Sequence, residues 1–184
     1  MTIKRLVSYL LVSFSLFIFS CHNNEEEIKT PEIPVNTRVF PDYHIALDSI
    51  VRTKEGIVCG VELGDSKAKI PAHEVQQAFE SDATHVTFEQ KIDSITKYNI
   101  TYVFENDSIA EIEVLIMSEN ADEGVQILND LKNYYTQKYT APLMDKGYFV
   151  FNCFDSKKKN FVITLTDNSG ASNSVIDMYV YKEK

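Results

Sequence analysis

Four histidines are the first candidates for acid–base chemistry in this 184-residue chain. A nucleophilic enzyme needs such a base within hydrogen-bond reach of a serine or a cysteine. The four are spread along the sequence as His22, His44, His73 and His85. His73 falls on the polar side of an expected short helix, and His85 begins an expected strand. We therefore interpret all four as surface residues and not as catalytic bases.

Sequence motifs of known enzyme classes provide no stronger evidence for catalysis. The sequence has no GxSxG, no HExxH and, with only six glycines, no glycine-rich phosphate loop. Glu111 and Glu113 come nearest to a carboxylate pair, because alternate residues of a strand share one face. A solvated sheet face explains these two glutamates better. We predict that the chain is not an enzyme and that it binds no cofactor.

Cysteines offer a different chemistry. Cys59 and Cys153 both lie in apolar, strand-like stretches, and an exported protein could join them in a disulfide. The alternative is that both are buried free thiols that pack as small hydrophobic residues. No CxxC spacing or matched pair of histidines accompanies them, so we predict no metal site.

The third cysteine, Cys21, follows a stretch typical of an export signal. Lys4 and Arg5 precede an apolar run over residues 6–19, which is the order of a basic n-region and an apolar h-region. The run is shorter than the roughly 20 residues that span a bilayer. A buried core helix is the alternative, although the run is apolar on every face. Residues 1–20 are therefore predicted to be a signal peptide.

The end of this run, Ile18-Phe19-Ser20-Cys21, resembles a bacterial lipobox. Ile18 and Ser20 fit the aliphatic and small positions of that motif, whereas Phe19 departs from it. The resemblance implies a diacylglycerol thioether on Cys21 and an acylated amino terminus. Two or three acyl chains would anchor the protein stably, because a single chain binds a membrane only marginally.

Residues 21–37 are expected to form the lipidated cysteine and a disordered tether, because they include two prolines and few large apolar residues. The acidic cluster Glu25, Glu26 and Glu27 resembles the surface-export signal of Bacteroidota lipoproteins. A solvated tether explains the same charges equally well. The expected location is the outer membrane, with the domain on the cell surface or on the periplasmic face.

A repeated tripeptide, Asp-Ser-Ile, occurs at residues 48–50, 93–95 and 107–109. It resembles the O-glycosylation acceptor of Bacteroidota, with Ser49, Ser94 and Ser108 as acceptors. Ordinary turn chemistry is the alternative, because Asp-Ser is favoured in turns.

Charge narrows the choice of partner. Residues 1–20 hold two of the 18 basic residues and none of the 27 acids, so the rest of the chain has a net charge of −11. Such a chain should repel nucleic acid and anionic lipid. We predict no nucleic-acid partner, membrane contact through the lipid anchor, and a protein partner.

Residues 38–184 are long enough for a single domain with a hydrophobic core. Residues 39–51 fit a strand or a helix, and residues 57–63 fit a strand. Two helices are expected over 71–81 and 120–139, the second with Asn120 and Glu123 as a capping box. Each helix is followed by three expected strands, over 86–89, 98–105 and 111–116, then over 148–154, 161–165 and 175–181.

This order predicts an α+β fold, in which two helices pack on one face of an antiparallel sheet and the order helix–three strands occurs twice. It resembles the tandem helix-on-sheet arrangement of the β-lactamase-inhibitor-protein-like group, which includes small outer-membrane assembly lipoproteins. Leu63-Gly64-Asp65-Ser66 resembles the entry turn of that group. The resemblance concerns the fold, and a fold does not imply a function.

The second helix shows which side chains should be buried. Ala121, Val125, Leu128, Leu131 and Tyr135 keep the helical period. Tyr134 is expected on the exposed side, where tyrosine would suit an interface.

Three classes of function remain. The first is a non-catalytic protein-binding or envelope-assembly module, which predicts an exposed apolar or tyrosine-bearing patch. The second is a lipoprotein that captures a glycan, peptide or haem for a transporter, which requires a concave pocket. The third is a hydrolase, which requires titratable groups clustered in a cleft.

Overall fold

The computed structural model describes residues 38–70, 78–155 and 158–183. Several predicted features lie outside the described residues, namely the signal peptide, Cys21, the tether with Glu25, Glu26 and Glu27, and both His22 and His73. They stay predictions.

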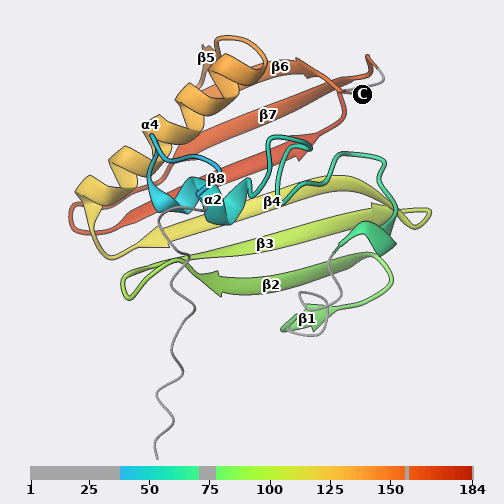
Figure 1. Cartoon of the computed structure of the whole chain (residues 1–184), viewed down its shortest axis with the longest axis horizontal. Coiled ribbons are helices and arrows are strands. Elements are labelled where there is room, and N and C mark those ends of the chain that lie inside the picture. Colours follow the sequence, from blue (N-terminus) through green and yellow to red (C-terminus); the bar gives the residue numbers. More distant parts are fainter. Residues whose placement is uncertain (1–37, 71–77, 156–157, 184) are drawn as a thin grey trace, which may run out of the picture. The chain divides into compact units, whose positions relative to one another are not determined.

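Within the described residues, eight strands form one antiparallel sheet (Figure 1). The order across the sheet is β1-β2-β3-β4-β8-β7-β6-β5. Two meanders, β1–β4 and β5–β8, therefore join where β4 pairs with β8. The strands are β1 (Glu80–Ser81), β2 (His85–Lys91), β3 (Thr96–Glu105), β4 (Ser108–Ser118), β5 (Leu143–Asp145), β6 (Tyr148–Phe154), β7 (Asn160–Asp167) and β8 (Ser174–Tyr181).

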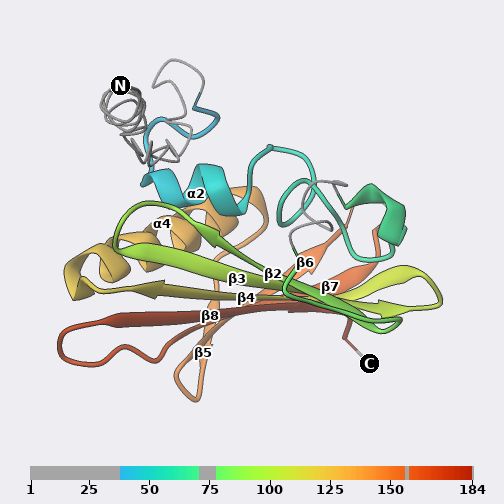
Figure 2. The same ribbon diagram turned by 90° about the horizontal axis from the view of Figure 1, so that it is seen from below.

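Helices α2 (Ile45–Ile50) and α4 (Ala121–Lys138) lie on one face of this sheet, and β5 lies on the opposite side (Figure 2). A short 3-10 helix, η2 (Lys67–Lys69), precedes the first meander. The prediction of an α+β fold with an antiparallel sheet is thus confirmed.

The predicted repeat of helix and three strands is not confirmed. The first predicted helix, 71–81, lies mostly outside the described residues, and its end is wrong. Glu80 and Ser81 instead form β1, paired with β2, and the Phe79 backbone N–H donates to the Thr87 carbonyl at 3.1 Å. These backbone bonds to β2 replace the helical bonds that the apolar spacing suggested.

The predicted strand over residues 57–63 is also wrong. Only one isolated bridge, between Val58 and Val61, occurs there. Cys59 and Gly60 both have positive φ, which reverses the chain direction. Ile57, Val58 and Val61 are buried because this loop packs into the core, not because it joins the sheet.

The ambiguous segment 39–51 forms the helix α2. The His44 side chain accepts a hydrogen bond from the Ala46 backbone and caps the helix. Asp48 is buried in it, bonds to Arg38 at 2.8 Å, and accepts from the backbone of Val39 at 2.7 Å.

Helix α4 confirms the predicted span and the predicted burial of Leu128, Leu131 and Tyr135, but its buried face is rotated from the predicted one. Val125 is 53 % exposed and Tyr134 only 8 % exposed, the reverse of the expectation. Gly124 explains the rotation, because a β-carbon there would lie 1.9 Å from the Ser174 hydroxyl oxygen. The helix thus approaches β8 along its smallest residue, and the buried side follows Gly124, Ile127, Leu128, Leu131, Tyr134 and Tyr135.

Gly124→Ala should therefore destabilise the fold by about 1–3 kcal/mol, even though alanine is the better helix former. Adding Ser174→Gly removes the clashing atoms and should recover most of this loss. Urea unfolding of the single and double variants measures both effects. A Gly124→Ala variant as stable as the parent would show that α4 does not pack this closely.

Candidate functional site

The sheet face opposite α2 and α4 carries the candidate site. In the β4–β8 register, Glu111 lies opposite Tyr181 and Glu113 lies opposite Tyr179. Directly opposed side chains in an antiparallel pair have β-carbons about 4.5–5.5 Å apart. Two glutamates and two tyrosines therefore form neighbouring pairs on the face that neither helix covers.

Strands β5, β6 and β7 extend this arrangement into a hollow. Thr164 of β7 lies opposite Tyr179, and Val150 of β6 lies opposite Thr164. Asp145 and Tyr148 face each other across the β5–β6 hairpin, and β5 stands on this side of the sheet (Figure 2). The resulting tyrosine hollow has a volume of about 340 Å³ and is lined by Glu111, Asp145, Tyr148, Val150, Thr164, Tyr179 and Tyr181.

The carboxylates around the tyrosine hollow are not neutralised. Among the described residues, no hydrogen bond or ion pair reaches the side chain of Glu111, Glu113 or Asp145. Burial, followed by Glu111 and Asp177, raises the pKa of Glu113. The same carboxylates act on Tyr179. Burial, followed by Asp177, Glu113 and Glu111, raises the pKa of its hydroxyl group.

Such a group of uncompensated like charges beside a hollow is typical of a functional site. Sequence reasoning placed Glu111 and Glu113 on one strand face, but it interpreted them as part of a solvated sheet face and not as a site. It missed Tyr148, Tyr179 and Tyr181. The alternation of Asp177, Tyr179 and Tyr181 in β8 was the available signal.

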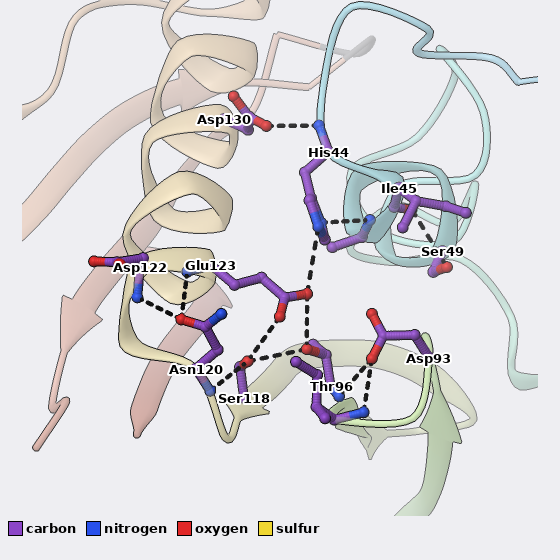
Figure 3. Close-up of polar contacts among 12 residues, drawn as sticks. His44, Ile45, Ser49, Asp93, Thr96, Ser118, Asn120, Asp122, Glu123 and Asp130 are labelled. Atoms are coloured by element: carbon purple, nitrogen blue, oxygen red, sulfur yellow. Dashed lines mark hydrogen bonds and ion pairs between the residues drawn. The ribbon is translucent and has the colours of Figure 1, made fainter. Parts of the chain in front are cut away.

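A second polar cluster joins the helices to the sheet (Figure 3). His44 Nε2 lies 3.3 Å from Glu123 Oε1. The hydroxyls of Thr96 and Ser118 donate to the two carboxylate oxygens of Glu123 at 2.9 and 3.2 Å. His44 Nδ1 accepts from the Ala46 backbone N–H at 3.2 Å. Both imidazole nitrogens are thus engaged, and neither hydroxyl contacts the imidazole.

This cluster lacks the nucleophile–base contact of a hydrolase, and we interpret it as a structural link. The prediction that His44 is a surface residue is wrong, because its side chain caps α2 and is only 18 % exposed. His85 begins β2 as predicted and lies within ion-pair distance of Glu80 and Asp82.

Comparison of the chain with protein-family models, with curated proteins and with solved structures gives no match.

The possible disulfide between Cys59 and Cys153 is not formed, and both cysteines are buried free thiols. Each thiol donates to a backbone carbonyl close to it in the sequence, Cys59 to Ile50 at 3.3 Å and Cys153 to Phe151 at 3.6 Å. Burial raises the pKa of both thiols, that of Cys153 to about 12. Both therefore stay protonated and unreactive. Within the described residues no cluster of potential ligands fits a metal ion.

The three Asp-Ser-Ile serines occupy different environments. Ser94 is exposed in the β2–β3 turn, where Asp93 accepts from the backbone of Ile95 and Thr96, both at 2.8 Å. Ser49 lies within α2, and Ser108 begins β4. Their glycosylation stays a prediction.

Glu113→Gln should stabilise the domain at neutral pH. A carboxyl group with a raised pKa in the folded state favours folding when protonated, and that contribution is lost as pH rises through the pKa. Removing the charge should raise Tm at pH 7 by up to about 2–4 °C, a partly exposed group contributing at most about 1 kcal/mol.

Thermal unfolding followed by circular dichroism measures this shift. Near pH 3 the Glu113 carboxyl group is protonated and is as neutral as glutamine, so the gain in Tm should vanish. Glu119→Gln, at the exposed residue that follows β4, is the matched control. A lower Tm for Glu113→Gln at pH 7 would contradict the proposed electrostatic repulsion.

Glu123→Ala should cost about 1–3 kcal/mol, because it leaves His44 and the hydroxyls of the buried Thr96 and Ser118 without their shared acceptor. The neighbouring change Asp122→Ala removes an exposed acid from the same helical turn and should cost less than about 1 kcal/mol. Urea unfolding compares the two variants. Equal losses of stability would show that Glu123 contributes only as a charge near the helix terminus and not through its contacts with His44, Thr96 and Ser118.

Proposed function

We propose that this chain is a non-catalytic, outer-membrane-anchored lipoprotein that binds a protein partner through the uncovered face of its sheet. The tyrosine hollow carries this proposal. Tyrosine is enriched in protein interfaces because it offers a large apolar surface together with a hydroxyl group. Burial and neighbouring carboxylates raise the pKa of Glu113, and a charge in such an unfavourable place is expected where binding takes precedence over stability.

Exposed apolar residues of β5 and β6, the two strands that contribute Asp145, Tyr148 and Val150 to the tyrosine hollow, also support a protein partner. Leu143, Met144, Tyr148 and Phe154 of β5 and β6 are all at least 44 % exposed. They account for four of the eight exposed large hydrophobic residues in the described chain. Apolar surface concentrated in one hairpin is characteristic of an interaction site.

The anchor is proposed from the sequence, through the lipobox-like segment and Cys21, with residues 21–37 as the tether. Among the described residues, no helix is long and apolar enough to cross a bilayer. The proposed location is the outer membrane, on the cell surface or on the periplasmic face.

We further propose that the architecture is a tandem one, with a helix before the strands of each half, as in the β-lactamase-inhibitor-protein-like group. Its support is the arrangement of the two meanders, which meet at β4 and β8 with α4 between them in sequence. An envelope-assembly role would be compatible with this architecture.

A ligand-capturing lipoprotein is the second candidate. The tyrosine hollow, at about 340 Å³, lies at the lower end of the volume range of small-molecule sites. The ligand that suits the tyrosine hollow best is a glycan or a peptide, because tyrosine rings and carboxylates offer stacking surfaces and hydrogen-bond acceptors.

Site-specific photo-crosslinking in the native host tests the protein-binding proposal. A photoreactive amino acid is placed at Tyr179 in one variant and at Val125, an exposed position on α4, in another. We expect a discrete protein adduct from position 179 and none from position 125. An adduct only from position 125 would place the interface on the wrong face, and no adduct from either position would reject a protein partner.

A further inference from the structure

The negative charge of the tyrosine hollow is local as well as global. Glu111 and Asp145 line the hollow, and Glu113 lies directly opposite Tyr179. Asp177, on the same strand face, accepts a hydrogen bond from the neutral amide of Asn168, which leaves its charge in place. No residue that lines the hollow is basic, and the whole chain has a net charge of −9. A ligand for this surface should therefore carry positive charge.

The aromatic rings point to the same chemistry. Elsewhere in the described chain, lysine amines already lie over ring faces. Lys132 lies 4.1 Å from the ring centroid of Phe149, and Lys67 lies 4.7 Å from that of Phe104. No lysine or arginine of the described residues occupies such a position over Tyr148, Tyr179 or Tyr181. These three rings are available to a cation from another molecule.

The geometry favours an organic cation over a metal ion. A divalent metal needs several oxygen ligands converging within about 2.0–2.6 Å, and the described residues contain no group of three or more acids, histidines or cysteines placed to do this. The acids instead lie opposite tyrosines in the strand register, Glu111 opposite Tyr181 and Glu113 opposite Tyr179. A guanidinium or ammonium group can contact a ring face and a carboxylate at the same time.

The surroundings favour a polypeptide as the source of that cation. The hollow opens on a sheet surface formed by β4, β8, β7 and β6, and the exposed Leu143 and Tyr148 lie at its β5–β6 border. An extended segment crossing these strands could place a basic side chain in the hollow and apolar side chains against the hairpin.

We propose that the tyrosine hollow binds an arginine or lysine side chain presented by an extended segment of a protein partner. This inference rests on the proposed protein-binding function and specifies the chemistry of the partner. Glu111 and Glu113 neutralise the cation, and Tyr179 contacts it with its ring face.

Binding of defined peptides to the full-length chain in detergent tests this inference. The probe is a fluorescently labelled hexapeptide of alternating glycine and arginine, and its control replaces each arginine with neutral citrulline. We expect the arginine peptide to bind, the citrulline peptide to bind at least about fivefold more weakly, and affinity to fall as salt rises. Equal binding of the two peptides would overturn the inference.

Matched variants locate the binding. Glu111→Gln with Glu113→Gln should weaken arginine-peptide binding at least about fivefold, and Glu119→Gln should leave it unchanged. Tyr179→Phe keeps the ring and should retain binding, whereas Tyr179→Leu should lose a few-fold of affinity. Circular dichroism checks that each variant is folded. Equal weakening by Glu119→Gln, or no effect of the double glutamine variant, would contradict the site.

Two further results separate this inference from the proposed function. If free arginine binds as tightly as the peptide, the inference that an extended segment presents the basic side chain is wrong. Capture of a protein by crosslinking at position 179, without binding of the arginine peptide, would reject the inferred basic side chain. It would leave the proposed protein-binding function intact.

Discussion

The pairing of β4 with β8 is the interaction on which the rest of this structure depends. It joins two meanders into one sheet, and it fixes both faces at once. On the core face it brings Val114 beside Met178, both buried beneath the helices. On the other face the same register brings Glu113 beside Tyr179. A shift of one residue would exchange the two faces, so the apolar core that stabilises the fold also determines the composition of the tyrosine hollow.

The two faces are stabilised very differently. The helix face is closely packed, since α4 approaches β8 at Gly124, and the Glu123 cluster satisfies its buried hydroxyls. On the opposite face, Glu89 is paired with Lys97 at 2.6 Å, whereas no hydrogen bond or ion pair among the described residues reaches the side chain of Glu111, Glu113 or Asp145. A domain of this size has a marginal net stability, so the unpaired carboxylates beside the tyrosine hollow support the proposal that this face serves binding. The helices pack on one face, and recognition is proposed for the other.

Local patterns in the sequence predicted much of the fold. Alternation located the longer strands, and the 3.6-residue period located α4, because both patterns follow from which side chains must face the core. Its rotation was missed, because a close glycine contact, at Gly124, outweighs the apolar character of Val125. The loop at residues 57–63 was missed because apolar residues in a tight turn resemble a strand. The tyrosine hollow could be predicted only in part, since Glu111 and Glu113 share a local pattern but meet Tyr179 and Tyr181 through long-range pairing.

Chemical-shift mapping by nuclear magnetic resonance tests the central claim most directly. The isotope-labelled full-length chain would be titrated with the arginine–glycine hexapeptide, and the perturbed amides would be assigned to one face of the sheet. We expect the largest shifts in β4 and β8 around Glu113 and Tyr179, with β6 and β7 following and α4 unchanged. Shifts concentrated in α2 and α4, or spread evenly over the acidic surface, would contradict a binding site on the uncovered face.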